Sequence, residues 1–235
     1  MQRAFDLAGQ EVDYMGIVIS GVSASSQDFA SLCRFAPQII ATTGIKLCAS
    51  LGLLSYEQGL RLKEAGFSSY HHNLETSRNF YPQICTSHPY QARIETIVNA
   101  KKAGLRVCAG GIFGVGESMR DLLDMALSLR ELAVDSVPIN FLNPIAGTPL
   151  EKRLPLAVNE ALAIIALYRL LLPTQDIVIG GGRSITLGDW QPNMFFAGAN
   201  GLMVGDYLTT RGAGLSADMA MLNMLGLKKN KTAAG

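Results

Sequence analysis

The chain has 235 residues, of which 49% are hydrophobic and 17% charged, and its formal net charge is +1. This composition is typical of a globular protein with a sizeable core, and the small net charge argues against nucleic acid or a membrane surface as a partner. The apolar runs are too short or too interrupted to span a bilayer, and the opening residues lack the apolar stretch of a signal peptide. Four cysteines without an export signal predict reduced thiols in a cytoplasmic protein.

Seven runs of the sequence are predicted to be strands. They are nearly continuous in apolar character, which suits parallel strands that are buried on both faces. Their first residues are Tyr14, Ile45, Ser68, Leu105, Ser136, Asp176 and Gly201.

Helical patterns lie between these runs. Residues 89–104 are predicted to form a helix. They begin with Pro89 and end at Gly104, and proline is common in the first turn of a helix and glycine just after its last turn. Residues 117–134 are amphipathic, with Ser118 as the predicted N-cap. Cys33 falls in a third helical pattern, where we expect it to serve packing. No low-complexity linker interrupts the series, so we predict a single domain over residues 1–235.

Alternating strands and helices fit either a doubly wound sheet or a (β/α)8 barrel. Polar and reactive residues near the carboxyl ends of several strands favour the barrel, because barrel active sites are built there. A complete barrel needs about 250 residues, so we predict an α/β barrel that is incomplete at the N-terminus. The residues concerned are Cys48, His71 to Asn73, Cys108, Asn140 and Arg183.

Residues 106–117, RVCAGGIFGVGE, are rich in glycine but match neither GxGxxG nor GxxxxGK, so the two common phosphate loops are excluded. Gly110, Gly111, Gly114 and Gly116 would let the backbone approach a flat ligand or adopt a positive φ. The alternative is tight packing of the backbone in the core. Taken alone, Cys108 is interpreted as a small buried apolar residue.

The segment that follows the third predicted strand is polar. His71 and His72 are consecutive strand residues and point to opposite faces, so at most one faces inward. In an extended segment Asn73 and Glu75 share a face and could hydrogen-bond the two hydroxyls of a ribose. The alternative is an ordinary polar loop.

Two later residues are unusual for their surroundings. Asn140 lies in an apolar strand and must find partners, either a polar ligand or a neighbouring backbone group. Arg183 follows three glycines at a strand end, and arginine is rarely buried without an anionic partner. A carboxylate, a phosphate or a metal–sulfur cluster would serve.

Three stretches together closely resemble the biotin synthases: residues 70–117, residues 136–151 (SVPINFLNPIAGTPLE) and residues 197–210 (AGANGLMVGDYLTT). The resemblance runs in order from near Gly16 to about residue 225. It implies a radical enzyme that uses S-adenosylmethionine (SAM) to insert sulfur into dethiobiotin. It also implies a 4Fe–4S cluster on a CxxxCxxC motif, an auxiliary cluster (2Fe–2S or a variant), an electron donor such as flavodoxin or ferredoxin, and a homodimer.

The resemblance also implies roles for individual residues. Cys48, Cys108 and Arg183 match ligands of the auxiliary cluster, the proposed sulfur source, so Cys108 and Arg183 are the expected catalytic residues. Asn73 and Glu75 match contacts to SAM and substrate. His71 and Asn140 match dethiobiotin contacts, although some members have asparagine in place of His71. The expected wall of the SAM pocket comprises Gly110, Gly111, Ile112, Gly114 and Glu117.

The chain departs from the family pattern in its cysteines, which are Cys33, Cys48, Cys85 and Cys108. None belongs to a CxxxCxxC motif, so the 4Fe–4S ligands are absent from this sequence. Gly16 stands where many members have a third auxiliary cysteine, and Cys85, which matches a family subset, is a candidate replacement ligand. N-terminal truncation by roughly 60–90 residues is the expected cause of the first departure, and we expect no turnover from the chain as printed.

Two other functions remain open. One is a degenerate barrel that binds dethiobiotin or a cluster without catalysis, which the missing motif and Gly16 favour. The other is a related radical SAM enzyme with another small-molecule substrate, such as those of hydrogenase or pyrrolysine assembly. Residues 137–151 and Arg183 favour biotin synthase over the latter.

Overall fold

The computed structural model describes residues 12–205 and 214–228. The opening residues and the end of the AGANGLMVGDYLTT motif therefore lie outside the described residues. The chain divides into two compact units, residues 1–111 with 117–137 and residues 112–116 with 138–235.

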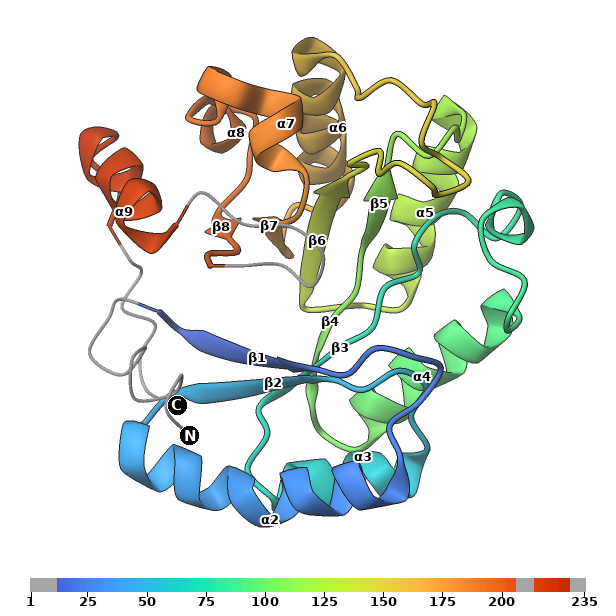
Figure 1. The fold of residues 1–235 in the computed structure, drawn as a ribbon, viewed down its shortest axis with the longest axis vertical. Helices are drawn as coiled ribbons and strands as arrows, with labels where there is room; N and C mark the ends of the chain where they lie inside the picture. The colour runs from blue at the N-terminus through green and yellow to red at the C-terminus, as the bar shows by residue number, and fades with distance from the viewer. Residues whose placement is uncertain (1–11, 206–213, 229–235) are drawn as a thin grey trace. The chain divides into compact units, whose positions relative to one another are not determined.

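The first unit is a parallel sheet with helices. Its first four strands pair in chain order and in parallel, as expected for successive βα units. In Figure 1, α2, α3 and α4 lie on one side of β1 and β2. The elements are β1 (Tyr14–Val18), α2 (Ser26–Thr43), β2 (Lys46–Ser50), α3 (Tyr56–Glu64), β3 (Ser69–His71), η1 (Tyr81–Gln83), α4 (Tyr90–Lys102), β4 (Arg106–Cys108) and α5 (Met119–Glu131).

The second unit contains the rest of the strands and helices. β6 begins in the first unit, where Ser136 pairs with Cys108, and continues into the second. There β5 pairs with β6, and β7 with β8 in parallel. The elements are β5 (Gly111–Phe113), β6 (Ser136–Phe141), α6 (Val158–Leu171), β7 (Asp176–Ile179), α7 (Arg183–Leu187), η2 (Gly188–Trp190), α8 (Asn193–Phe196), β8 (Gly201–Leu202) and α9 (Leu215–Met224).

All seven predicted strands are present, but the run from Leu105 to Gly114 forms two strands, β4 and β5. The break lies at Ala109 and Gly110. The Gly110 carbonyl accepts the N–H groups of Leu74 and Glu75, at 2.9 and 3.2 Å. Its own N–H donates to the side-chain oxygen of Asn73 at 3.1 Å. Gly110 thus directs its hydrogen bonds to the loop after β3, which interrupts the strand.

The predicted helices and buried strands are confirmed. Ser118 caps α5 by accepting the N–H of Asp121, and Gly104 follows α4 with φ 80°. Cys33 lies in α2. Leu47, Ala49 and Tyr70 in neighbouring strands are fully buried, as expected for a parallel sheet with an apolar core. Among the described residues, no helix combines the length and apolarity needed to cross a membrane.

The residue after the helix C-cap has a left-handed backbone in three helices of the first unit. After α3 and α4 this residue is a glycine, Gly66 (φ 90°) and Gly104 (φ 80°). After α5 it is Ala133, with φ 48°. A left-handed alanine is strained by its Cβ, whereas glycine is not.

We therefore expect Ala133→Gly to raise the free energy of unfolding by about 0.5–1 kcal/mol. Urea denaturation would measure the change. Ala65→Gly is the matched control, because Ala65 caps α3 with φ −73° and has no strain to relieve; it should destabilise the chain by about 0.5–1 kcal/mol. A loss of stability in both variants would contradict the expectation.

Candidate active site

The ends of β3 and β4 bring a histidine and a cysteine together. His71 and Cys108 are register partners, and the His71 Nδ1 lies 3.4 Å from the Cys108 Sγ. Burial lowers the pKa of His71 to about 4, so its ring is neutral at physiological pH. His72 has different surroundings: its ring is buried, its Nε2 has no partner, and burial lowers its pKa to about 3.

Cys48 lies in the middle of β2, between two register partners. Gly16 of β1 is on one side and Ser69 of β3 on the other. Burial raises the pKa of the Cys48 thiol, against a hydrogen bond from Ser69 that lowers it. A Cβ added at Gly16 would meet no atom within 4 Å. The position beside Cys48 therefore has room for a side chain.

Asn73 and Glu75 are brought together, but not by an extended backbone as the sequence suggested. Asn73 Nδ2 donates to Glu75 Oε2 at 3.3 Å. Glu75 has φ 71°, a left-handed conformation that costs a non-glycine residue about 1–3 kcal/mol. The hydrogen bonds to Gly110 and a bridge to Gly111 hold it there. Such strain is typical of functional positions.

Arg93 of α4 holds this pair in place. Its Nη1 donates to the main-chain oxygen of Asn73 at 2.8 Å and lies 3.4 Å from Glu75 Oε1. Burial raises the pKa of Glu75, and the positive charge of Arg93 opposes that effect. Sequence reasoning missed Arg93, because an arginine on an amphipathic helix resembles a surface charge. Its position in the first turn, facing the strand ends, was the only signal.

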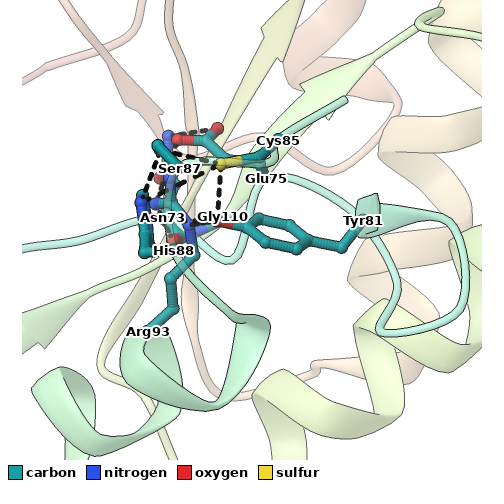
Figure 2. Close-up of polar contacts among 8 residues, drawn as sticks. All are labelled: Asn73, Glu75, Tyr81, Cys85, Ser87, His88, Arg93 and Gly110. Atoms are coloured by element: carbon teal, nitrogen blue, oxygen red, sulfur yellow. Dashed lines mark hydrogen bonds and ion pairs between the residues drawn. The ribbon is translucent and has the colours of Figure 1, made fainter. Parts of the chain in front are cut away.

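Tyr81 connects Arg93 to Cys85. The Arg93 Nε donates to the Tyr81 hydroxyl at 2.8 Å, and that hydroxyl donates to the Cys85 sulfur at 3.0 Å. Figure 2 shows the two contacts at one phenol oxygen, with His88 nearby. Burial raises the pKa of Cys85, but hydrogen bonds from Ser87 and Tyr81 outweigh it and lower the pKa to about 7.

The glycine-rich segment has positive φ at two of its glycines and is tightly packed at a third. Gly114 and Gly116 have φ 90° and 112°, whereas Gly110 and Gly111 do not have positive φ. A Cβ added at Gly111 would lie 2.9 Å from the carbonyl carbon of Glu75 and 2.9 Å from Met125 Cε. Gly111 thus admits the Glu75 backbone. Ile112 is half-buried and Glu117 is half-buried at the end of the segment.

In the second unit, the two unusual residues have partners from the protein itself. Asn140 Oδ1 accepts the N–H of Gly181 at 2.8 Å, which is the backbone alternative. Arg183 is buried, and its Nη2 donates to both oxygens of Asp218 at 2.7 Å. Its Nη1 donates to Gln191. The anionic partner present is therefore a carboxylate. Sequence reasoning missed Asp218, whose short helix shows no amphipathic pattern.

Three of the predicted metal ligands, Cys48, Cys85 and Cys108, lie in the first unit. In the part of the chain that the structure describes, no three Cys, His, Asp or Glu side chains are arranged to hold a metal ion. Cys85 forms its hydrogen bonds within its own loop, with Tyr81 and Ser87.

We expect Gly111→Ala to reduce the free energy of unfolding by roughly 1–3 kcal/mol, because the backbone of Glu75 leaves no room for a methyl group. Chemical denaturation would measure the loss. Gly16→Ala is the control, since that strand glycine has open space; its effect should stay within about 1 kcal/mol. Equal losses in the two variants would refute this packing argument.

Cys85 should be the thiol most readily alkylated near neutral pH. Because its pKa is lowered to about 7, the thiolate fraction and the labelling rate should rise through a midpoint near pH 7. Tyr81→Phe removes a donor to the sulfur and should move the midpoint upward. Iodoacetamide labelling with peptide mass spectrometry would measure this, with Cys33 as the internal control because burial raises its pKa. Identical pH profiles for Cys85 and Cys33 would contradict the expectation.

Comparison with known proteins places both units of the chain. Residues 4–129 match the model of the radical SAM superfamily, and residues 138–228 match that of the biotin and thiamin synthesis associated domain. The biotin synthase of Nitratidesulfovibrio vulgaris strain Hildenborough is 50% identical over 228 residues, which cover 97% of this chain and 63% of that protein. The biotin synthase of Geobacter sulfurreducens is 49% identical over 225 residues, covering 95% and 68%. The chain thus spans about two thirds of the length of these relatives, or slightly less.

Solved structures support the predicted fold. Methylornithine synthase superposes with a TM-score of 0.81 at 19% identity, covering 98% of this chain and 72% of that one. The FeFe-hydrogenase maturase of Carboxydothermus hydrogenoformans superposes with a TM-score of 0.77 at 16% identity, covering 96% and 57%. The α/β fold of the radical SAM superfamily is therefore confirmed. By its sequence similarity over almost its whole length, the chain belongs to the biotin synthase family of the radical SAM superfamily.

Proposed function

We propose that this chain acts in the insertion of sulfur into dethiobiotin to form biotin, with SAM as cofactor. The observation that carries the proposal is the strained Glu75 beside Asn73. A half-buried carboxylate is held there in a left-handed backbone conformation that costs about 1–3 kcal/mol, and it accepts a hydrogen bond from the Asn73 amide. Two similarities agree with the proposal. Residues 4–129 match the radical SAM superfamily, and the chain is 50% identical to a biotin synthase over 228 residues.

The Asn73–Glu75 pair suits the ribose of SAM. A carboxylate accepts hydrogen bonds from hydroxyls, and an amide offers both a donor and an acceptor. Arg93 orients the pair, while Gly110 and Gly111 bring the backbone close to it. Ile112, Gly114 and Glu117 are proposed to complete the wall of the SAM pocket. His71 and Asn140 are proposed to contact dethiobiotin.

The thiols suit an auxiliary iron–sulfur cluster only in part. Cys48 and Cys108 are soft ligands of the right chemistry. We propose them, and not Cys85, because Cys85 is engaged within its own loop. Arg183 is proposed as the third ligand, although both of its terminal nitrogens have protein partners here. The ligands of a SAM-binding 4Fe–4S cluster are not among the printed residues, so no step is assigned to that cluster.

When bound, SAM and the iron–sulfur clusters would supply the radical chemistry and the sulfur. The chain's own residues have the simpler tasks of binding and orientation. Glu75 and Asn73 orient SAM, the neutral His71 ring lies beside the Cys108 sulfur, and the buried strand ends exclude water. We further propose an electron donor such as flavodoxin or ferredoxin, a homodimer, and a cytoplasmic location.

The proposal is tested with the full-length protein, its clusters reconstituted. Glu75→Gln should weaken SAM binding by about 10- to 100-fold, because a charge-assisted hydrogen bond to the ribose is lost. Calorimetry would measure the affinity, and conversion of dethiobiotin to biotin would measure the activity. Glu95→Gln is the matched control, since Glu95 is an exposed carboxylate of the same helix as Arg93.

The pH dependence offers a second readout. Burial raises the pKa of Glu75. As the solution is acidified, Glu75 is therefore protonated at a higher pH than an ordinary glutamate, and its carboxylate can no longer accept two hydrogen bonds as an anion. Wild-type affinity for SAM should fall accordingly, and that of Glu75→Gln should stay flat. Undiminished binding by Glu75→Gln would contradict the proposed role. Binding of dethiobiotin without product would favour the degenerate, non-catalytic barrel.

A further inference from the structure

The ring of Tyr81 is fully buried and is held in place without help from its hydroxyl. The Tyr81 N–H donates to the Ser77 carbonyl at 2.9 Å. Its own carbonyl accepts the N–H groups of Ile84 and Cys85, each at 3.0 Å. The ring packs edge-on against that of Tyr90, with 5.3 Å between the ring centroids. The phenol oxygen is therefore a fixed point within the first unit.

The phenol oxygen accepts a hydrogen bond from Arg93 Nε at 2.8 Å. Arginine has no acceptor atom, so the oxygen uses a lone pair for this contact, and its hydrogen is left for Cys85 or His88. Because the donor is charged, this bond belongs to the stronger class of protein hydrogen bonds. The guanidinium carbon also lies over the ring, 5.3 Å from its centroid. Tyr81 thus holds the guanidinium through both its hydroxyl and its ring.

The guanidinium carries this restraint to the Asn73–Glu75 pair. Its nitrogens lie in one rigid plane, so a hydrogen bond at Nε limits where the two terminal nitrogens can lie. Nη1 donates to the Asn73 carbonyl at 2.8 Å and lies 3.4 Å from Glu75 Oε1. Figure 2 shows the Arg93 side chain reaching from α4 toward the phenol oxygen and the pair.

Of the hydrogen-bond partners of Arg93 among the described residues, only Tyr81 lies outside the Asn73–Glu75 pair. Without the phenol hydroxyl, Arg93 and the pair would restrain only one another. The arginine would then recover part of its rotamer freedom, which is among the largest of any side chain. Glu75 needs an external restraint in particular, because its left-handed backbone is not a conformation that glutamate prefers.

We propose that Tyr81 is a positioning residue of the SAM site: its hydroxyl fixes the orientation of Arg93, and Arg93 in turn holds Asn73 and Glu75 where they can bind the ribose. The inference rests on the proposed function, which assigns that pair to SAM. It extends the site to η1, an element from which no contact with SAM is proposed.

The experiment uses the full-length protein with its clusters reconstituted, and calorimetry measures its affinity for SAM. Tyr81→Phe keeps the ring and removes the hydroxyl, while Arg93 keeps its other acceptors, so the chain should still fold. Tyr90→Phe is the matched control, because Tyr90 is the buried tyrosine of the same ring pair and its hydroxyl has no hydrogen-bond partner among the described residues. Both substitutions are repeated in an Arg93→Lys background, which keeps the charge but loses the planar fork that links the phenol to the pair.

We expect Tyr81→Phe to weaken SAM binding by about 5- to 20-fold, and Tyr90→Phe to change it by less than about twofold. In the Arg93→Lys background, Tyr81→Phe should add a loss of less than about twofold, because residues that act through one group have non-additive effects. Equal losses in the two backgrounds would mean that Tyr81 supports the fold and not Arg93, and would overturn the proposal.

Glu75→Gln in the same assay separates this inference from the proposed function. If Glu75→Gln weakens SAM binding and Tyr81→Phe does not, the positioning role of Tyr81 is wrong and the proposed function stands. If neither substitution weakens SAM binding, the assignment of the Asn73–Glu75 pair to SAM is contradicted, and the inference falls with it.

Discussion

The hydrogen bonds of Gly110 are the constraint on which the first unit's polar site depends. One residue accepts two backbone N–H groups from the loop after β3 and donates to the Asn73 side chain. These bonds end β4, start β5 a residue later, and hold Glu75 in a conformation that it would not adopt alone. The interruption of the strand and the placement of the carboxylate are consequences of the same interaction.

The two units stabilise their charged groups in different ways. In the first unit, Arg93 spreads its hydrogen bonds over a carbonyl, a carboxylate and a phenol. In the second, Arg183 concentrates its charge on a single carboxylate. A distributed arrangement tolerates the loss of one acceptor better than a single buried pair does, because the charge retains other partners. The charge balance of the second unit is therefore more sensitive to a single substitution.

Much of the fold follows from local sequence patterns. The apolar runs at Lys46–Ser50 and Asp176–Ile179 are strands, and Ser118 caps its helix, because these features depend on neighbouring residues. The partners of Arg93 and Arg183 could not be predicted in this way. Glu75 and Asp218 lie 18 and 35 residues from them, and no periodicity relates such positions. The left-handed Glu75 was unpredictable for the same reason, since the atoms that hold it belong to Gly110.

The phenol of Tyr81 has one hydrogen atom and two acceptors that compete for it. Its oxygen lies 3.0 Å from the Cys85 sulfur and 3.1 Å from His88 Nε2, while Arg93 donates to it from the other side. If the hydrogen points to the sulfur, His88 must carry its own proton on Nε2 and present Nδ1 as an acceptor to the Ser87 hydroxyl, 2.8 Å away. If the hydrogen points to His88, the tautomer reverses: His88 Nδ1 then donates to the Ser87 oxygen, and the Ser87 hydrogen is free to point to the sulfur, 3.4 Å away. The tautomer of His88 therefore decides whether Tyr81 or Ser87 donates to the Cys85 sulfur.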